Sequence, residues 1–168
     1  MNNLNKTNII PESNLESGIM MIDERIMNTR DLRIGDKVLY DGLVYEITQL
    51  NDLSARILRN GYGRLVLSGE LEPIQITDEL LEKLCFEKKA YACEDTNPED
   101  NLDYYIFNIG DYEIVLDLGD VVDSYDGKCN IQIDKKEELL FCDKISYLHE
   151  LQHLLWDAKV EINTINKL

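Results

Sequence analysis

The chain of 168 residues has few cysteines, few basic residues and no long apolar run, and each shortage excludes a class of protein. Its cysteines include no Cys-x-x-Cys pair, which excludes a zinc ribbon and a thioredoxin-like site, and they are too few and too irregularly spaced for a disulfide framework. No stretch approaches the roughly eighteen apolar residues of a membrane-spanning helix, so we expect no membrane partner. We expect reduced thiols at all four cysteines: Cys85, Cys93, Cys129 and Cys142.

Basic residues are the scarcer charged class. Lys and Arg total 17 against 33 Asp and Glu, which gives a formal net charge of −16. Binding to nucleic-acid phosphates needs a Lys/Arg surface, so we expect no direct nucleic-acid binding. Residues 27–76 are nearly neutral, whereas residues 77–168 are strongly acidic, and this asymmetry predicts two modules or one continuous domain with two halves. Residues 1–26 show no sustained period, and we expect a flexible leader there.

Short strands and tight turns dominate the nearly neutral module. Asp41-Gly42 separates two runs of β-forming residues, which is a strong hairpin signal because both central positions of a type I′ turn need positive φ. Asn60-Gly61 predicts a second turn in the same way. The pattern predicts a small SH3-like barrel or a bent antiparallel sheet with five strands: residues 37–40, 43–50, 53–58, 64–67 and 72–76.

The acidic module begins with a helix signal. Thr77 is a good N-cap, and leucines at three following positions give the helix one apolar face up to about residues 85–86. Residues 93–102 are polar and contain a proline, which predicts a loop. Alternation of apolar and polar residues then predicts strands at 104–108, 112–116, 130–134 and 139–142, and a short strand over 160–165. Between the last two of these, a helical pattern predicts a final helix to about residue 158.

Together these elements predict an α+β fold. A barrel-like N-terminal sheet is followed by a short helix and by a second antiparallel sheet that the C-terminal helix packs against. Apolar spacing within the elements predicts a core of sixteen residues: Ile34, Val38, Val44, Ile47, Ile57, Leu65, Leu81, Leu84, Phe86, Ile106, Ile114, Leu116, Ile131, Leu148, Leu151 and Leu155.

The residues HELQH, at positions 149–153, form a literal His-Glu-x-x-His pattern on the predicted final helix. Imidazoles four residues apart project from one side of a helix and can share one Zn²⁺, while the Glu polarises the bound water. One hypothesis is therefore a zinc hydrolase in which His149 and His153 bind the metal and Glu150 is the catalytic base.

The sequence around this pattern argues against a hydrolase. A catalytic zinc site needs a third protein ligand, and Trp156 and Lys159 stand where a metzincin would continue the pattern with Gly and a ligand. Without that third ligand, we expect no catalytic residue and no cofactor. A bound zinc ion is expected only under the hydrolase hypothesis.

A helical wheel gives the pattern a structural interpretation. Leu148, Leu151 and Leu155 form the apolar centre of the helix, which places both histidines at its boundary, beside Trp156. Glu150 falls on the opposite face, where we expect it to point into solvent.

Four acidic residues at three-residue spacing make a second candidate cation site: Asp117, Asp120, Asp123 and Asp126. Calcium prefers clustered carboxylates, but the EF-hand pattern of alternate Asp or Asn with a terminal Glu is absent. We therefore expect a solvated acidic loop.

Three blocks of the sequence resemble a family of small proteins from phages and mobile elements of Bacteroidetes-type bacteria. They are DLRIGDKVLYDGLVYEI at residues 31–47, LEPIQITDELLEKLCFEKK at 71–89 and KISYLHELQHLLW at 144–156. The family has no known activity and often carries Gln and Asn at the positions of Glu150 and His153, which implies a helix without catalytic groups. It usually has Gly where this chain has Cys85, which implies that the turn here does not need positive φ.

These observations predict a non-catalytic accessory or interaction protein of a phage or mobile element. The expected partner is a protein, and the expected location is the cytoplasm, of the host if a phage encodes the chain, with the virion as the alternative. Besides the zinc hydrolase, a further hypothesis is that acidic residues 77–168 mimic nucleic acid and occupy a basic groove on a host protein, which a negative surface would attract.

Overall fold

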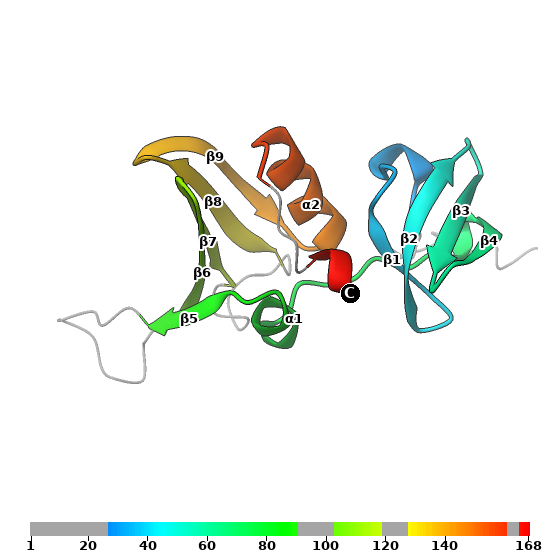
Figure 1. Cartoon of the computed structure of the whole chain (residues 1–168), viewed down its shortest axis with the longest axis horizontal. Coiled ribbons are helices and arrows are strands. Elements are labelled where there is room, and N and C mark those ends of the chain that lie inside the picture. The colour runs from blue at the N-terminus through cyan, green and yellow to red at the C-terminus, as the bar shows by residue number, and fades with distance from the viewer. Residues whose placement is uncertain (1–26, 91–102, 119–127, 161–164) are drawn as a thin grey trace, which may run out of the picture.

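The computed structural model describes residues 27–90, 103–118, 128–160 and 165–168, which form two antiparallel sheets and few helices (Figure 1). The predicted α+β class is confirmed, with two bent sheets, and within the described residues neither sheet closes into a barrel. The predicted leader, the loop at 93–102 and most of the predicted strand at 160–165 lie outside the described residues.

The first sheet is a meander of four strands in chain order: β1 (Lys37–Tyr40), β2 (Leu43–Leu50), β3 (Ser54–Arg59) and β4 (Tyr62–Leu67). Asp41 and Gly42 join β1 to β2 with φ of 50° and 70°, and Asn60 and Gly61 join β3 to β4 with φ of 50° and 81°. Paired positive φ is what a type I′ turn requires, so both predicted hairpins are confirmed.

The fifth strand predicted for this sheet, residues 72–76, is wrong. The segment makes only single bridges, from Glu72 to Leu39 at one end and from Gln75 to Tyr147 at the other. It therefore passes from the first sheet to the start of the final helix, and its apolar residues pack without joining a sheet.

The second sheet also runs in chain order: β5 (Glu87–Ala90), β6 (Asp103–Ile109), β7 (Tyr112–Asp117), β8 (Cys129–Lys135) and β9 (Glu138–Ile145). Four of these strands contain the predicted ones. The sequence does not predict β5, because its residues EKKA show no apolar alternation and it pairs through its backbone with β6.

The first helix, α1 (Asp78–Lys83), begins and ends with local hydrogen bonds. The Thr77 hydroxyl accepts from the Leu80 amide, as its N-cap position predicts. At the other end the Phe86 amide donates to the Leu81 carbonyl across Cys85, which has a φ of 68°. This is a Schellman motif, which needs positive φ at Cys85, so the prediction of an ordinary turn there is wrong.

The second helix, α2 (Leu148–Asp157), lies between the two sheets (Figure 1). Three single turns of 3₁₀ helix complete the described elements: η1 (Thr29–Asp31), η2 (Ser68–Glu70) and η4 (Ile165–Lys167). None of the helices in the described part of the chain is long and apolar enough to pass through a bilayer.

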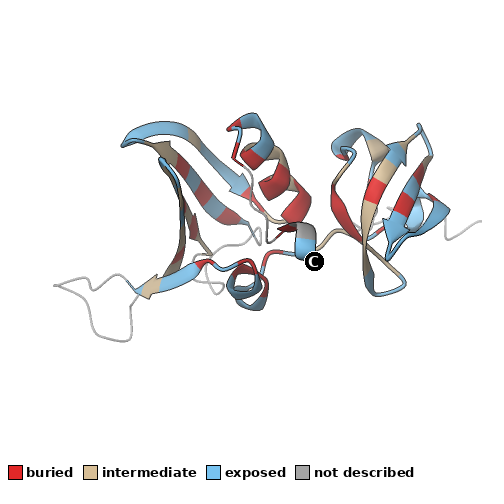
Figure 2. Cartoon of the chain, viewed as in Figure 1, coloured by how far each residue is buried: buried red, intermediate tan, exposed pale blue. Residues whose placement is uncertain are grey.

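Buried apolar residues form two clusters, one in each sheet (Figure 2). Most of the predicted core is buried, but Ile34 and Leu65 are 62 % and 64 % exposed, and Val44 and Ile106 are half-buried. Strand alternation explains two of these errors. Val66 takes the inward position on β4 and Tyr105 takes it on β6, so the neighbouring Leu65 and Ile106 face away from the core.

Candidate functional site

The HELQH residues lie on a helix that is covered on two sides. The Leu148, Leu151 and Leu155 face packs into the core of the second sheet, as the wheel predicts, and these residues are at most 2 % exposed. The adjacent face meets residues 33–37, the turn that leads into β1. Both faces of α2 are therefore occupied by protein (Figure 2).

Gln152 makes the most buried polar contact between α2 and the first sheet. Its Oε1 accepts from the Lys37 amide at 3.0 Å, and its Nε2 donates to the Gly35 carbonyl at 3.2 Å. The side chain is 3 % exposed. Sequence reasoning missed this residue because a glutamine on a helix ordinarily lies in solvent, and no local pattern marks a partner in another sheet.

His153 pairs with a buried carboxylate of the same turn. Its Nε2 lies 3.0 Å from both oxygens of Asp36, which is fully buried. The Asp36 carboxylate also accepts from the Arg33 amide at 2.7 Å, so its position is fixed from two directions. The Nε2 nitrogen of His153 is therefore already engaged by a neighbouring acid.

The end of α2 adds two further contacts to residues 33–37. Trp156 packs against Gly35, where a Cβ atom would come within 3.2 Å of the indole ring, and φ of 99° also favours glycine. Asp157 forms an ion pair with Arg33 at 3.0 Å, and the guanidinium keeps the pKa of Asp157 below its usual value. We call the contacts of Gln152, His153, Trp156 and Asp157 with residues 33–37 the α2 clamp.

Glu150 turns back onto the start of its own helix. Its Oε2 accepts from the amide of the N-cap residue Tyr147 at 3.0 Å, which is the capping-box bond, and from the amide of the preceding Ser146 at 2.7 Å. The side chain is half-buried, so the prediction that it points into solvent is wrong. It caps the helix instead.

His149 is buried, not at the rim as the wheel predicts. Its residue exposure is 6 %, and its ring stacks on Tyr147 with centroids 5.8 Å apart. Burial lowers the pKa of the imidazole, and Nδ1 has no hydrogen-bond partner among the described residues. The helical wheel failed here because it considers only the apolar face of the helix. It does not account for a second segment of the protein that packs on another face of the same helix.

A cavity of about 150 Å³ lies where His149 and Glu150 meet η1, with Asp31 and Asn28 on the η1 side. In the part of the chain that the structure describes, no three His, Cys, Asp or Glu residues come together in a group that could hold a metal ion. The cavity therefore combines two acids with one buried imidazole without assembling a metal centre.

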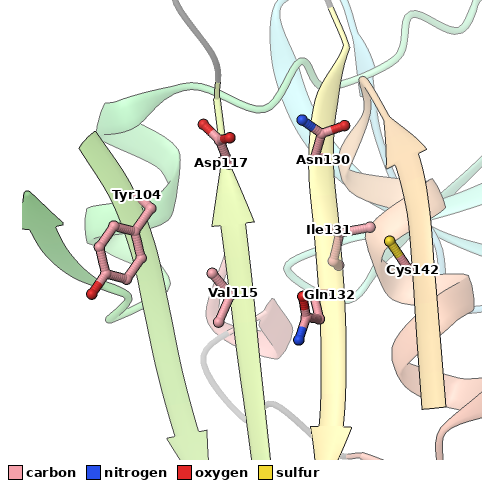
Figure 3. A pocket seen from close by; sticks show the side chains of 7 residues that line it. All are labelled: Tyr104, Val115, Asp117, Asn130, Ile131, Gln132 and Cys142. Atoms are coloured by element: carbon pink, nitrogen blue, oxygen red, sulfur yellow. The ribbon is translucent and has the colours of Figure 1, made fainter. Parts of the chain in front are cut away.

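A second pocket, of about 240 Å³, lies across β6, β7, β8 and β9 (Figure 3). Tyr104, Asp117 and Asn130 line it near one end of these strands, and the Cys142 thiol lines it on β9. No motif marks these residues in the sequence. Of the acidic residues considered for calcium, only Asp117 is described, at the end of β7; Asp120, Asp123 and Asp126 lie outside the described residues.

The cysteines that are described have free thiols. Cys129 is buried and donates to the Ile145 carbonyl at 3.0 Å, and burial raises the pKa of its thiol to about 11. A thiol with a raised pKa is a poor nucleophile, so Cys129 fits a structural role.

The three sequence blocks at residues 31–47, 71–89 and 144–156 meet at α2. Residues 31–47 supply the turn that the clamp binds. Residues 71–89 contribute the Ile74 carbonyl, which accepts from the Leu148 amide at 2.8 Å, and the Ile76 amide, which donates to Ser146 at 2.9 Å. These blocks therefore share one structural task, which is to hold the sheets against one helix.

Comparisons of the chain with models of protein families, with curated proteins and with solved structures found no match.

Proposed function

We propose that this chain is a non-catalytic interaction protein of a phage or mobile element, in which HELQH joins two sheets. The observation that carries this proposal is the engagement of three polar HELQH side chains with protein groups. His153 binds Asp36, Gln152 binds backbone groups of residues 35 and 37, and Glu150 caps its own helix.

The same contacts weigh against the zinc hydrolase. A catalytic zinc site needs both imidazoles directed at one ion and a carboxylate directed at its water. Recruiting Nε2 of His153 would break its pair with Asp36 and leave that buried carboxylate with only the Arg33 amide as a partner, which is destabilising. Recruiting Glu150 would uncap α2. The HELQH sequence thus serves stability better than catalysis.

The surface that best suits a protein partner is the outer face of β3 and β4. Arg56 stands directly opposite Leu65 in the antiparallel register, and Leu58 and Leu67 lie on the same face. Leu65 and Leu67 are 64 % and 61 % exposed. Singly exposed leucines are ordinary, but a group of them beside a guanidinium on one sheet face is typical of interaction sites.

Among the described strands, β4 is also an edge of its sheet, since it pairs there with β3 alone. An edge strand can offer backbone groups to an added strand; on β4 the Leu67 amide already donates to Glu70, and Arg64 is the one charged residue of the strand. We infer a partner that adds an extended segment to β4, with apolar side chains over Leu65 and Leu67 and an acidic side chain toward Arg56.

The experiment compares Leu65→Asp with Leu139→Asp as bait in capture from host cells. Leu139 lies on β9 with 56 % exposure, so its variant introduces the same charge on a similarly exposed leucine elsewhere. We expect a protein that the wild type and Leu139→Asp retain and Leu65→Asp loses. If all captured proteins remain with Leu65→Asp, the β4 surface is not the docking site.

A further inference from the structure

One side of α2 faces the half of the chain that forms the first sheet. Four residues at helical spacing share this side: His149, Gln152, His153 and Trp156. The last three belong to the α2 clamp and contact residues 35–37. His149 lines a cavity together with Met27 and Asp31, which lie just before and within η1. His149 therefore lies on the clamp side of α2, one turn nearer the start of the helix.

The two hydrophobic cores have no buried residue in common among the described residues. Leu148, Leu151 and Leu155 of α2 belong to the core of the second sheet, whereas Met27 and Leu32 belong to the core of the first. Apart from the indole ring of the clamp, the contacts between α2 and residues 33–37 are hydrogen bonds and ion pairs. Water can replace such bonds when the contact opens. Opening the clamp therefore exposes less apolar surface than unfolding either sheet.

His149 is a titratable side chain buried beside this contact. Its exposure is 6 %, its ring stacks on Tyr147, and its Nδ1 atom is closed to solvent and has no hydrogen-bond partner among the described residues. An imidazolium carries an N–H donor on both ring nitrogens, so protonation would leave a buried donor at Nδ1 without an acceptor. Burial accordingly lowers the pKa of the His149 imidazole.

Charged groups from three elements face His149, and they act in opposite directions. Asp31 of η1, Asp36 of the turn before β1 and Glu150 of α2 attract an imidazolium, whereas His153 repels one. Asp36 already binds Nε2 of His153, so a second imidazolium would share that carboxylate. Asp31 is exposed to water, and Oε2 of Glu150 accepts from two amides, which weakens the attraction of both. The closed clamp therefore disfavours the charged form of His149.

We propose that the α2 clamp is an acid-sensitive switch, which opens when His149 takes up a proton and lets the two sheets separate while each stays folded. In the open state water solvates the imidazolium, so the open state binds the proton more tightly than the closed state. A ligand that prefers one of two states shifts the population toward that state, by at most the ratio of its two affinities. Unfolding would release the same strain but would also lose both cores, so opening comes first. The switch needs no partner at β4 and is independent of the function proposed above.

The test follows amide hydrogen exchange of the full chain by NMR from about pH 7.5 to about pH 5.5. The Lys37 amide donates to Oε1 of Gln152 and reports on the clamp. The amides of Ile57 and Leu116 lie on buried inner strands and report on the two sheets. Each rate is divided by that of the same amide in an unfolded peptide at the same pH. We expect this ratio to rise at least about threefold in acid for Lys37 and to rise less for the other two.

His149→Gln is the informative variant, because glutamine keeps a polar side chain there and does not titrate. The Lys37 ratio should then show no rise in acid, since a charge on His153 strengthens its pair with Asp36. The second histidine of the chain supplies the comparison. His153→Gln should raise the Lys37 ratio already at about pH 7.5, because Asp36 then loses a partner.

Equal rises at Lys37, Ile57 and Leu116 would overturn the proposal, because the whole fold would then open in one step. A Lys37 ratio that stays flat in the wild type would overturn it as well, and neither result depends on a variant. A rise that persists in His149→Gln would assign the acid sensitivity to another group, and the proposal would again be wrong.

Discussion

Gln152 satisfies one backbone donor and one backbone acceptor that belong to a different sheet. One group lies in the turn before β1 and the other on the first residue of β1, where a side chain from α2 replaces the water that exposed backbone groups would bind. The neighbouring His153 and Asp36 pair adds a second polar contact, in which Asp36 is fully buried and the His153 side chain is 18 % exposed. At the scale of single residues, the join between the sheets is therefore polar and specific rather than apolar.

Replacing Gln152 with alanine should cost about 2–4 kcal/mol in the free energy of unfolding. The change leaves the buried Lys37 amide and the partly buried Gly35 carbonyl without these partners, and a buried group left unpaired costs about 1–3 kcal/mol. Urea unfolding followed by circular dichroism measures the loss.

Gln49→Ala is the matched control, because Gln49 is exposed on β2 and its loss should change stability by less than about 0.5 kcal/mol. Equal effects of the two substitutions would show that the contacts of Gln152 do not hold the sheets together.

His149 should make the fold less stable in acid. Burial lowers its pKa, although the nearby carboxylates of Asp36, Glu150 and Asp31 oppose that shift. The unfolded chain then binds more protons than the folded chain, so the stability that this group supplies is complete above its unfolded pKa and declines as pH falls below it. We expect the free energy of unfolding to fall from about pH 7.5 to about pH 5.5.

The variant His149→Gln isolates this effect, since glutamine does not titrate over this range. Its stability should fall less than that of the wild type between the same two pH values. A wild type and a variant with parallel pH profiles would assign the acid sensitivity to other groups.

At the scale of elements, local turn chemistry predicted most of the fold. The turn and cap signals each affect backbone groups no more than four residues away. The structure has a turn or a helix start at each of them: Asp41-Gly42, Asn60-Gly61 and Thr77. Strand β5 was missed because its pairing with β6 depends on backbone groups, which leave no mark on the side-chain pattern. Elements that depend on nearby residues were therefore predictable from the sequence. Elements that depend on pairing with a segment distant in the sequence were not.

Helix α2 illustrates the same limit at the candidate site. Periodicity predicted the Leu148, Leu151 and Leu155 face, because one sheet covers it. The second face is polar, and its burial depends on a turn more than a hundred residues earlier in the chain. Nothing within the helix distinguishes a buried Gln152 or His149 from an exposed one.

Both α-helices end in a Schellman motif with a residue other than glycine in the left-handed position. Cys85 has φ of 68° after α1, and Lys159 has φ of 61° after α2. A side chain in this region costs about 1 kcal/mol relative to glycine. Cys85→Gly should therefore raise the free energy of unfolding by about 0.5–1 kcal/mol, measured by urea unfolding, and Lys159→Gly should act in the same direction.

Cys85→Ala is the control for the first of these variants. It removes the same thiol but keeps a Cβ atom, so it should give no gain in stability. If Cys85→Ala stabilises the chain as much as Cys85→Gly, the gain comes from losing the thiol and not from relieving the backbone.

At the scale of the whole molecule, two hydrophobic cores are joined through one helix. The charge asymmetry of the sequence predicts two modules or one continuous domain, and this stays a prediction. The structure contains one apolar cluster with the first sheet and another with the second. The sequence could not predict how they associate, because the contacts of the α2 clamp are polar and distant in sequence. Opening the clamp would expose Asp36 and Gln152 together, so the sheets should separate as one cooperative step.

The measurement that tests the clamp most directly is the free energy of unfolding with excess Zn²⁺ and with EDTA. A ligand that binds only the folded state stabilises it, by about 2.7 kcal/mol at a concentration one hundred times its Kd. If HELQH is a clamp, the two unfolding curves should coincide, because His153 and Glu150 are held by protein groups. A gain of that size with Zn²⁺ that His153→Ala abolishes would contradict the account and establish a metal site.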